Sequence, residues 1–243
     1  MEWVDRAAPR SRARLTGVVY LLYFLTAVAS ALIPPGIGGP NGLPSNADSF
    51  ANSITSNPSS YEIATAVGLI STLLYVALAV LFYELFRPVS RTMALLMMVF
   101  SLAGSVITAA GTVLQLAPLA VLDGSSYLNA LDAKQLHAIA LLLLHVSAQS
   151  GAVALAFFGV FQLLLGYLIY RAGFIPALIG VLIAVAGVGW LTFLYPPLST
   201  FLLTELEVLG FVAELVLMLW LLIRGVDDRR WAERAATSTR ARP

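Results

Sequence analysis

Glu214 is the residue of this sequence whose type and position most strongly suggest chemistry. It lies ten residues before Arg224 in a long apolar segment, about 15 Å along a helix and therefore near the middle of a membrane span. Inserting an ionisable group at that depth costs roughly 2.5–3.5 kcal/mol, which makes Glu214 a candidate functional residue. Glu207 and Gly210 precede it by seven and four residues and share its helix face. This stripe predicts a path for a proton or cation; the alternative is a protonated Glu214 that bonds a neighbouring helix.

A second polar stripe lies on one face of the apolar segment 92–116. Its members are spaced by four, three, four and three residues, which keeps them within about 80° of one another at 100° per residue. They are Ser101, Ser105, Thr108, Thr112 and Gln115. Gly104 and Gly111 lie beside them. The stripe indicates either a hydrated cavity or close helix packing, because small and hydroxylated residues serve both purposes in membranes.

The two histidines argue against a metal or haem site. His137 and His145 are eight residues apart, about 12 Å along one helix, which is too far for one shared metal ion. The absence of cysteine excludes disulfides, thiol catalysis and Cys-ligated metals. We therefore expect no cofactor and no metal, with a site completed by Glu205 or Glu207 as the alternative. His145 and Gln149, one turn apart, are expected to line an outer vestibule or to bond a neighbouring helix.

Long apolar segments must position these residues. The chain has 243 residues, of which 59% are hydrophobic and 11% charged, whereas soluble domains carry about 25% charged residues. Six segments are long enough to cross a hydrocarbon core of about 30 Å, and they should be helices because lipid offers the backbone no hydrogen-bond partners. They are Leu15–Ile33, Ile63–Phe86, Thr92–Leu116, Gly151–Tyr170, Ile175–Tyr195 and Phe201–Ile223. The predicted fold is an all-α bundle of about six transmembrane helices.

Basic residues predict the orientation of this bundle. Thirteen of the 14 positive charges fall on one side of the predicted spans, and only Lys134 falls on the other. By the positive-inside rule that side is cytoplasmic, so both termini are expected there. This gives a cytoplasmic arm 1–14, a transmembrane domain 15–224 and a cytoplasmic basic tail 225–243. The alternative for the first span is a signal peptide cleaved after Ala29-Ser30-Ala31.

Two regions outside the predicted spans carry further expectations. Helical composition extends back from the fourth span to about 136, so we expect a projecting helix; the alternative is a break near Gln149–Gly151 with a re-entrant piece before it. The outer loop Pro34–Tyr61, rich in Gly, Pro, Ser and Asn, is expected to bury no core. Near the other boundary, Glu84 should pair with Arg87, one turn away. Trp231 in the Arg-rich tail is expected to be an interfacial anchor, with a site for anionic lipid as the alternative.

Several segments resemble one membrane protein family. They are Phe157-Phe158-Gly159, Leu165–Ile169, Gly173–Pro176, Leu178–Val181, Arg14–Leu22, Arg87-Pro88-Val89 and Glu214–Val226. Together they resemble the bacterial multi-pass family known as domain of unknown function 4386 (DUF4386). The family tends to carry an Arg-Leu pair early in its third helix, where this chain has Phe100-Ser101-Leu102. The resemblance implies a multi-helix protein of the bacterial inner membrane and no established activity.

Three functions are compatible with these residues. The first is a small transporter or permeation protein with a proton-titratable Glu214 and a pathway between the second, third and sixth spans. The second is a structural or accessory subunit whose polar faces pack helices or dock a membrane partner or a second copy. The third is an intramembrane enzyme that uses Glu214 with His145 on a lipid. The expected partner in every case is the lipid bilayer, and no feature predicts binding to nucleic acid.

Overall fold

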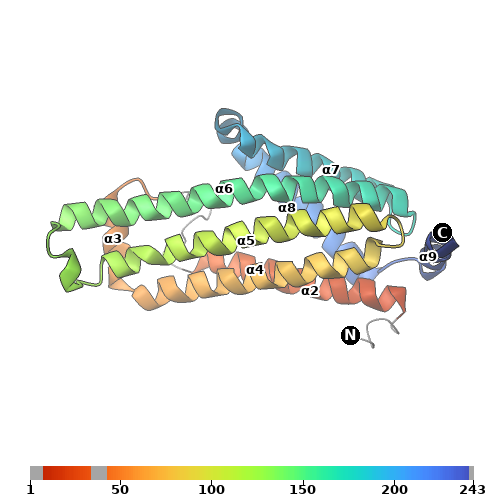
Figure 1. Ribbon diagram of the computed structural model, residues 1–243, viewed down its shortest axis with the longest axis horizontal. Helices are drawn as coiled ribbons and strands as arrows, with labels where there is room; N and C mark the ends of the chain where they lie inside the picture. Colours follow the sequence, from red (N-terminus) through yellow and green to blue (C-terminus); the bar gives the residue numbers. More distant parts are fainter. Residues whose placement is uncertain (1–7, 34–42, 241–243) are drawn as a thin grey trace. The chain divides into compact units, whose positions relative to one another are not determined.

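The computed structural model describes residues 8–33 and 43–240; within that range the side chains of 196–204, 207 and 238–240 are left aside. Every regular element in this part of the chain is a helix (Figure 1), which confirms the predicted all-α fold. The α-helices are α2 (Pro9–Leu32), α3 (Ala47–Ser56), α4 (Pro58–Phe86), α5 (Arg91–Val121), α6 (Ala133–Ala172), α7 (Ala177–Leu191), α8 (Pro196–Ile223) and α9 (Asp228–Arg240). Two short 3₁₀ turns are η1 (Ser126–Leu128) and η2 (Thr192–Leu194).

Five of these helices are long and apolar enough to cross a membrane within the described residues. They are α2, α4, α5, α6 and the segment Ala177–Leu194, which joins α7 and η2. The described segment Val208–Ile223 of α8 qualifies as a sixth span together with α9, from which it is bent by 99°. Six of the 13 residues of α9 are charged, and burying so many charges in the hydrocarbon core of a membrane would be costly. The protein is therefore a multi-pass membrane protein with five to six spans.

Proline and glycine set the ends of several helices. Pro88 follows α4, and Pro176 precedes α7, because proline lacks the amide hydrogen that a helix interior requires. Gly173 and Gly225 follow α6 and α8 with φ angles of 77° and 70°, a left-handed conformation that glycine adopts without steric cost. The neighbouring helices α6 and α7 are consequently joined by a turn of only four residues, 173–176.

The α6 helix is continuous over 40 residues, about 60 Å at 1.5 Å per residue. Ser150 and Gly151 are both helical, so the break considered near Gln149–Gly151 does not occur. The helix therefore has the length that a projecting segment requires. The projection of its first turns beyond the bilayer stays a prediction.

The chain forms two compact units. The first unit contains the chain up to Leu22, Leu74–Ser105 and everything from Val153 onward; the second contains Tyr23–Leu73 and Val106–Ala152. The core of the first unit is aromatic, with Tyr20, Phe82, Phe86 and Phe161 all nearly inaccessible. Its aromatic rings contact one another, for example Tyr20 edge-on against Phe82 at 5.8 Å between ring centroids.

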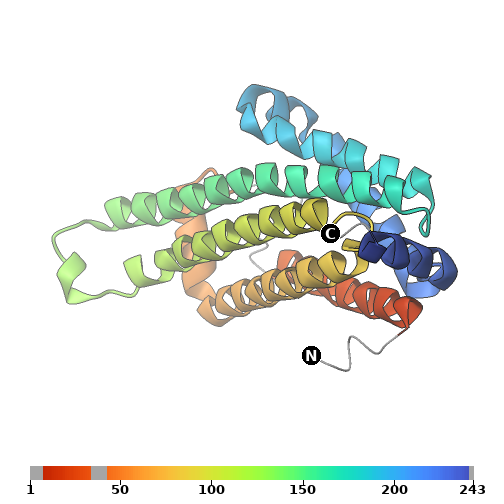
Figure 2. The ribbon, with the colours of Figure 1, turned by 45° about the vertical axis from the view of Figure 1, so that its right-hand side comes forward.

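Glycine pairs hold α6 against α7 in the first unit, where both views show the two helices side by side (Figure 1 and Figure 2). A Cβ atom on Gly166 would lie 2.5 Å from the carbonyl oxygen of Gly180, and one on Gly187 would lie 2.8 Å from that of Gly159. Each pair therefore allows a backbone contact that any side chain would prevent. Close approach through small residues is a main source of helix association in membranes, where the hydrophobic effect between helices is absent.

In the second unit, α3 corrects the expectation that the loop 34–61 buries no core. Phe50 and Ile54 of α3 are buried and belong to one cluster with Tyr61, Ala140 and Leu144. Asn46 caps the start of this helix, because its Oδ1 atom accepts a hydrogen bond from the Ser49 backbone N–H at 2.9 Å. Composition alone was misleading because two apolar residues four apart suffice to give a short helix a buried face. Residues 34–42 of the loop lie outside the described part.

Candidate functional site

Glu214 lies in the first unit, where side chains from three helices meet. The Gln162 Nε2 atom of α6 donates a hydrogen bond to Glu214 Oε1, and the Tyr20 hydroxyl of α2 is hydrogen bonded to the same carboxyl group. Gln162 and Tyr20 are each only 1% exposed. Both of these partners are neutral, and no basic side chain of the described residues joins them.

The Gln162 amide has one unsatisfied atom. Its Oε1 is buried and has no hydrogen-bond partner among the described residues. Leaving a buried acceptor unpaired costs about 1–3 kcal/mol. If the amide turns by 180°, this oxygen faces Glu214 and can accept a hydrogen bond from a protonated carboxyl group, whereas the present orientation suits a carboxylate. The Gln162 amide can therefore hydrogen bond to Glu214 in both protonation states of the carboxyl group.

The predicted stripe toward Glu207 is interrupted at Gly210. A Cβ atom there would lie 2.5 Å from the Trp190 ring of α7, so the indole covers the space beside this glycine. Glu207 belongs to α8, but its side chain lies outside the described ones. Glu205, five residues before Gly210, is exposed. An aromatic ring therefore lies against the middle position of the face that the sequence suggested as a path.

The polar stripe of α5 divides into a packed part and a cavity. Ser105 is buried and its hydroxyl donates to the Ser101 carbonyl oxygen at 2.9 Å. In the second unit, Thr108, Thr112 and Gln115 line a cavity of about 180 Å³ with residues of α6. Ser147 borders the same cavity and donates to the Gly111 carbonyl oxygen at 2.8 Å. The stripe therefore has a packed beginning and a later part that borders a cavity of mixed polar and apolar lining. Hydration of this cavity stays a prediction.

The hydrogen bond that the structure gives His145 lies within its own helix, so the expected lining of a vestibule by His145 and Gln149 stays a prediction. Its Nδ1 atom lies 2.9 Å from the Leu141 carbonyl oxygen. Gln149 is exposed. The enzyme hypothesis gave His145 a joint role with Glu214, whose side-chain partners are Tyr20 and Gln162 instead. No described contact supports such a pair.

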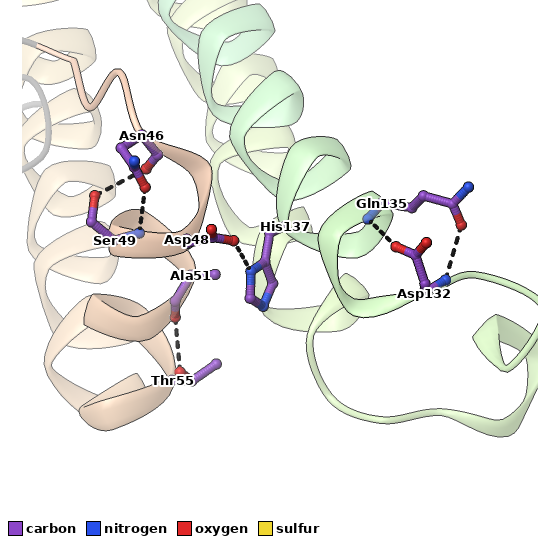
Figure 3. A network of polar contacts seen from close by, with 8 residues as sticks. All are labelled: Asn46, Asp48, Ser49, Ala51, Thr55, Asp132, Gln135 and His137. Carbon is purple, nitrogen blue, oxygen red and sulfur yellow. Dashed lines mark hydrogen bonds and ion pairs between the residues drawn. The ribbon is translucent and has the colours of Figure 1, made fainter.

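The second unit also holds a polar network at α3 and the start of α6 (Figure 3). His137 Nδ1 lies 2.7 Å from Asp48 Oδ1, and Asp132 and Gln135 exchange reciprocal hydrogen bonds that cap α6. In the turn after α5, hydrogen bonds from the Ser125 side chain and amide hold the pKa of Asp123 below its usual range. Among the described residues no three His, Asp or Glu side chains gather as a metal site would require.

Comparison with known proteins identifies the family. Residues 15–225 match the family described as Domain of unknown function (DUF4386). The chain belongs to this family. An uncharacterized protein of Archaeoglobus fulgidus is 28% identical to this DUF4386 protein over 155 residues, which cover 63% of this chain and 78% of the relative. No solved structure matches the chain significantly.

The α9 helix of this DUF4386 protein contacts the ends of α4 and α6. Trp231 Nε1 donates to the Leu85 carbonyl oxygen at 3.0 Å, and Arg230 donates to that of Gly173 at 2.7 Å. Arg234 donates to the Arg171 carbonyl oxygen at 2.9 Å. The carbonyl groups at a helix C-terminus lack partners within the helix, and cationic donors suit the negative end of its dipole. We name this part of the first unit, which carries Arg10, Arg171, Arg224 and α9, the basic end.

The expected ion pair between Glu84 and Arg87 is present near the same helix ends. Arg87 Nη2 lies 3.1 Å from Glu84 Oε2. Both side chains are partly exposed, so the pair contributes little stability, about 0–1 kcal/mol. Glu84 therefore has a local structural role, which makes it a suitable control residue for Glu214.

Proposed function

We propose that this DUF4386 protein is a small proton-coupled transporter or permeation protein in which Glu214 takes up and releases the proton. The proposal rests on one observation: a membrane-buried carboxyl group held by Gln162 and Tyr20, with a spare acceptor on the same amide. An ionisable group inside a membrane bundle is most often part of an ion or proton pathway. The arrangement supplies what such a group needs, which is a neutral partner that can hydrogen bond to both of its protonation states.

The polar cavity of the second unit supports the same function. Thr108, Thr112 and Gln115 present side chains to a space of about 180 Å³, enough for several water molecules. A permeation pathway needs space beside polar side chains within the span, and this cavity supports the proposal by providing such a space. In the proposed topology there are six spans, both termini lie in the cytoplasm, and the protein resides in a bacterial inner membrane.

The second candidate function is that of a structural or accessory subunit. Hydroxyl groups that bond their own helix favour it: Ser105 donates to Ser101, and Thr112 donates to the Thr108 carbonyl oxygen at 3.1 Å. Such hydroxyls are satisfied without water or substrate. On this hypothesis the Glu214 contacts serve helix packing alone.

Proton flux separates the two candidates. The purified full-length protein is reconstituted into proteoliposomes containing a pH-sensitive dye, and a pH gradient with a potassium potential drives flux. We expect Glu214→Gln to abolish protein-dependent proton flux and to retain the thermal unfolding transition. The glutamine amide can still form hydrogen bonds, but it cannot take up and release a proton. Glu214→Leu should abolish flux and also lower stability, since it leaves Gln162 and Tyr20 without an acceptor.

Glu84→Gln provides the matched control. It removes the same charge and leaves the Glu214 contacts untouched, so flux should remain at the wild-type level. If Glu214→Gln conducts protons as well as the wild type, or if empty liposomes conduct as well as the protein, the transport function is rejected in favour of the structural subunit.

A further inference from the structure

A polar groove opens at the basic end of the first unit. Its volume is about 740 Å³, and it lies where the chain turns from α6 to α7 and from α8 to α9. Its charged lining consists of Arg10, Arg224, Arg229, Arg230, Asp227 and Asp228. The groove thus holds four cationic and two anionic side chains and attracts an anion.

The two aspartates are committed to contacts within the protein. Asp228 Oδ1 accepts a hydrogen bond from the Arg10 backbone N–H at 2.7 Å, and Asp227 Oδ2 lies 3.8 Å from Arg230 Nε. By contrast, the guanidinium groups of Arg10 and Arg224 make no ion pair or hydrogen bond with the described residues. Both arginines are exposed. Within the described part of the chain, they are therefore the cationic groups of the groove that carry no polar side-chain contact and can meet a ligand.

A second, apolar groove begins beside the first. It holds about 330 Å³ between α6 and α7 and is lined by Leu163, Gly166, Tyr167, Val181, Val185 and Val188, among others. Tyr170 lines both grooves. Gly166 and Gly180, which form the close contact between the two helices, also line this groove. Its outer rim faces away from the core, since Val185 is 50% exposed.

We propose that the two grooves together bind one anionic phospholipid, with its phosphate at Arg10 and Arg224 and an acyl chain between α6 and α7. A soluble anion would leave the apolar groove empty, and a neutral hydrocarbon would leave both guanidinium groups without a partner. A ligand with a negative head joined to an apolar tail satisfies both grooves at once. Arginine suits a phosphate because its planar group donates two parallel hydrogen bonds. This site is independent of Glu214 and of the proposed transport function.

Native mass spectrometry of the full-length protein in neutral detergent tests the site. Phosphatidylglycerol and phosphatidylcholine with the same acyl chains are offered together, and the dissociation constants for the first bound lipid are compared. Each arginine near an anionic lipid contributes about fivefold in affinity, so two should give phosphatidylglycerol an advantage of roughly thirtyfold. Arg10→Gln with Arg224→Gln should abolish that advantage, whereas Arg87→Gln with Arg91→Gln, which removes equal charge elsewhere, should preserve it.

A second pair of variants tests the acyl chain. Val181→Phe fills the apolar groove and should weaken binding of phosphatidylglycerol, whereas Leu178→Phe should not, because Leu178 is 78% exposed and does not line the groove. Circular dichroism melting confirms that the variants are folded.

Three results would overturn the proposal. They are equal retention of both lipids by the wild type, equal losses in the two arginine double variants, and displacement of the lipid by inorganic phosphate combined with no effect of Val181→Phe. The last result would assign the groove to a soluble anion.

Discussion

At the residue scale, the proposal that Glu214 carries a proton depends on the Gln162 amide. It donates to Glu214 with one of its ends and keeps a buried, unpaired oxygen at the other. Buried acceptors in folded proteins are usually paired, either with protein groups or with ordered water. The spare acceptor is accounted for if the amide also serves the protonated state of Glu214.

Gln162→Leu tests this interpretation. The change removes a hydrogen bond to the carboxyl group, but it also removes the unpaired oxygen, and the two effects are of similar size, about 1–3 kcal/mol each. We therefore expect the free energy of unfolding to change little while proton flux falls to background. Gln149→Leu, an exposed position on the same helix, should leave both unchanged. Full flux in Gln162→Leu would show that the amide has no part in proton transfer.

Glu214 was identified from the sequence, whereas its partner Tyr20 was missed. Depth along the span and the cost of burying a carboxyl group make a central Glu conspicuous in any apolar segment. Tyrosine gives no such signal, because its amphipathic ring is equally at home facing lipid, a boundary or another helix. Tyr20 reaches Glu214 because α2 lies beside α8. The hydropathy of a single segment does not reveal which helices are neighbours in a bundle.

At the element scale, glycine pairs determine how α6 and α7 pack. Gly159 of α6 contacts Gly187 of α7, and Gly166 of α6 contacts Gly180 of α7. The two glycines of each helix are seven residues apart. The contact leaves no room for a methyl group at any of the four positions. These glycines therefore fix the distance between the two helices, and two of them, Gly166 and Gly180, also line the apolar groove beside Tyr170.

We expect Gly166→Ala to destabilise the protein by about 1–3 kcal/mol, the range found for overpacked sites. Its new methyl group would lie 2.5 Å from the Gly180 carbonyl oxygen, so the backbones must separate. The control is Gly151→Ala on the same helix, where nothing lies within 4 Å of the new atom; alanine there should be neutral or stabilise by up to about 1 kcal/mol. Thermal unfolding in detergent, followed by circular dichroism, measures both. Equal stability of the two variants would contradict the packing contact.

Helix positions were largely predictable from the sequence, whereas the structure of the connections was not. The lengths of the apolar segments and the positions of the prolines predicted the bounds of α4, α5, α6 and α7 to within a few residues, apart from one extra turn each on α4 and α5. The α3 helix was missed because its polar composition resembles a loop, while its stability comes from Phe50 and Ile54 packing in a cluster with Ala140 and Leu144. Similarly, the contacts of α9 depend on carbonyl groups at the ends of α4 and α6 that only the folded chain brings near Trp231 and Arg230.

At the scale of the whole molecule, the distribution of charge predicts how the protein sits in the membrane. The basic residues gather on one side of the predicted spans, and several donate to carbonyl groups at helix ends. Positive charge on one side of the spans and satisfied helix ends are consistent with one orientation, in which the basic end faces the cytoplasm.

Single cysteine substitutions test that orientation cleanly, because the chain has no natural cysteine. Ser45→Cys and Ser125→Cys should react with a membrane-impermeant maleimide in intact cells. Ser90→Cys and Ser238→Cys should react only after the cells are opened. Labelling of Ser238→Cys from outside would reverse the predicted position of the C-terminus, and labelling of both Ser45→Cys and Ser238→Cys would require an odd number of spans.

The most direct measurement of the central claim is an infrared difference spectrum of the wild-type protein in liposomes across a pH step. If Glu214 takes up a proton while Gln162 turns to receive its hydrogen bond, a carboxylic acid C=O band and a side-chain amide band should change together. Both changes should be absent in Glu214→Gln, and only the amide change should be absent in Gln162→Leu. A spectrum without a carboxylic acid band that depends on Glu214 at any pH tolerated by the fold would contradict the claim, because Glu214 would then keep one protonation state throughout.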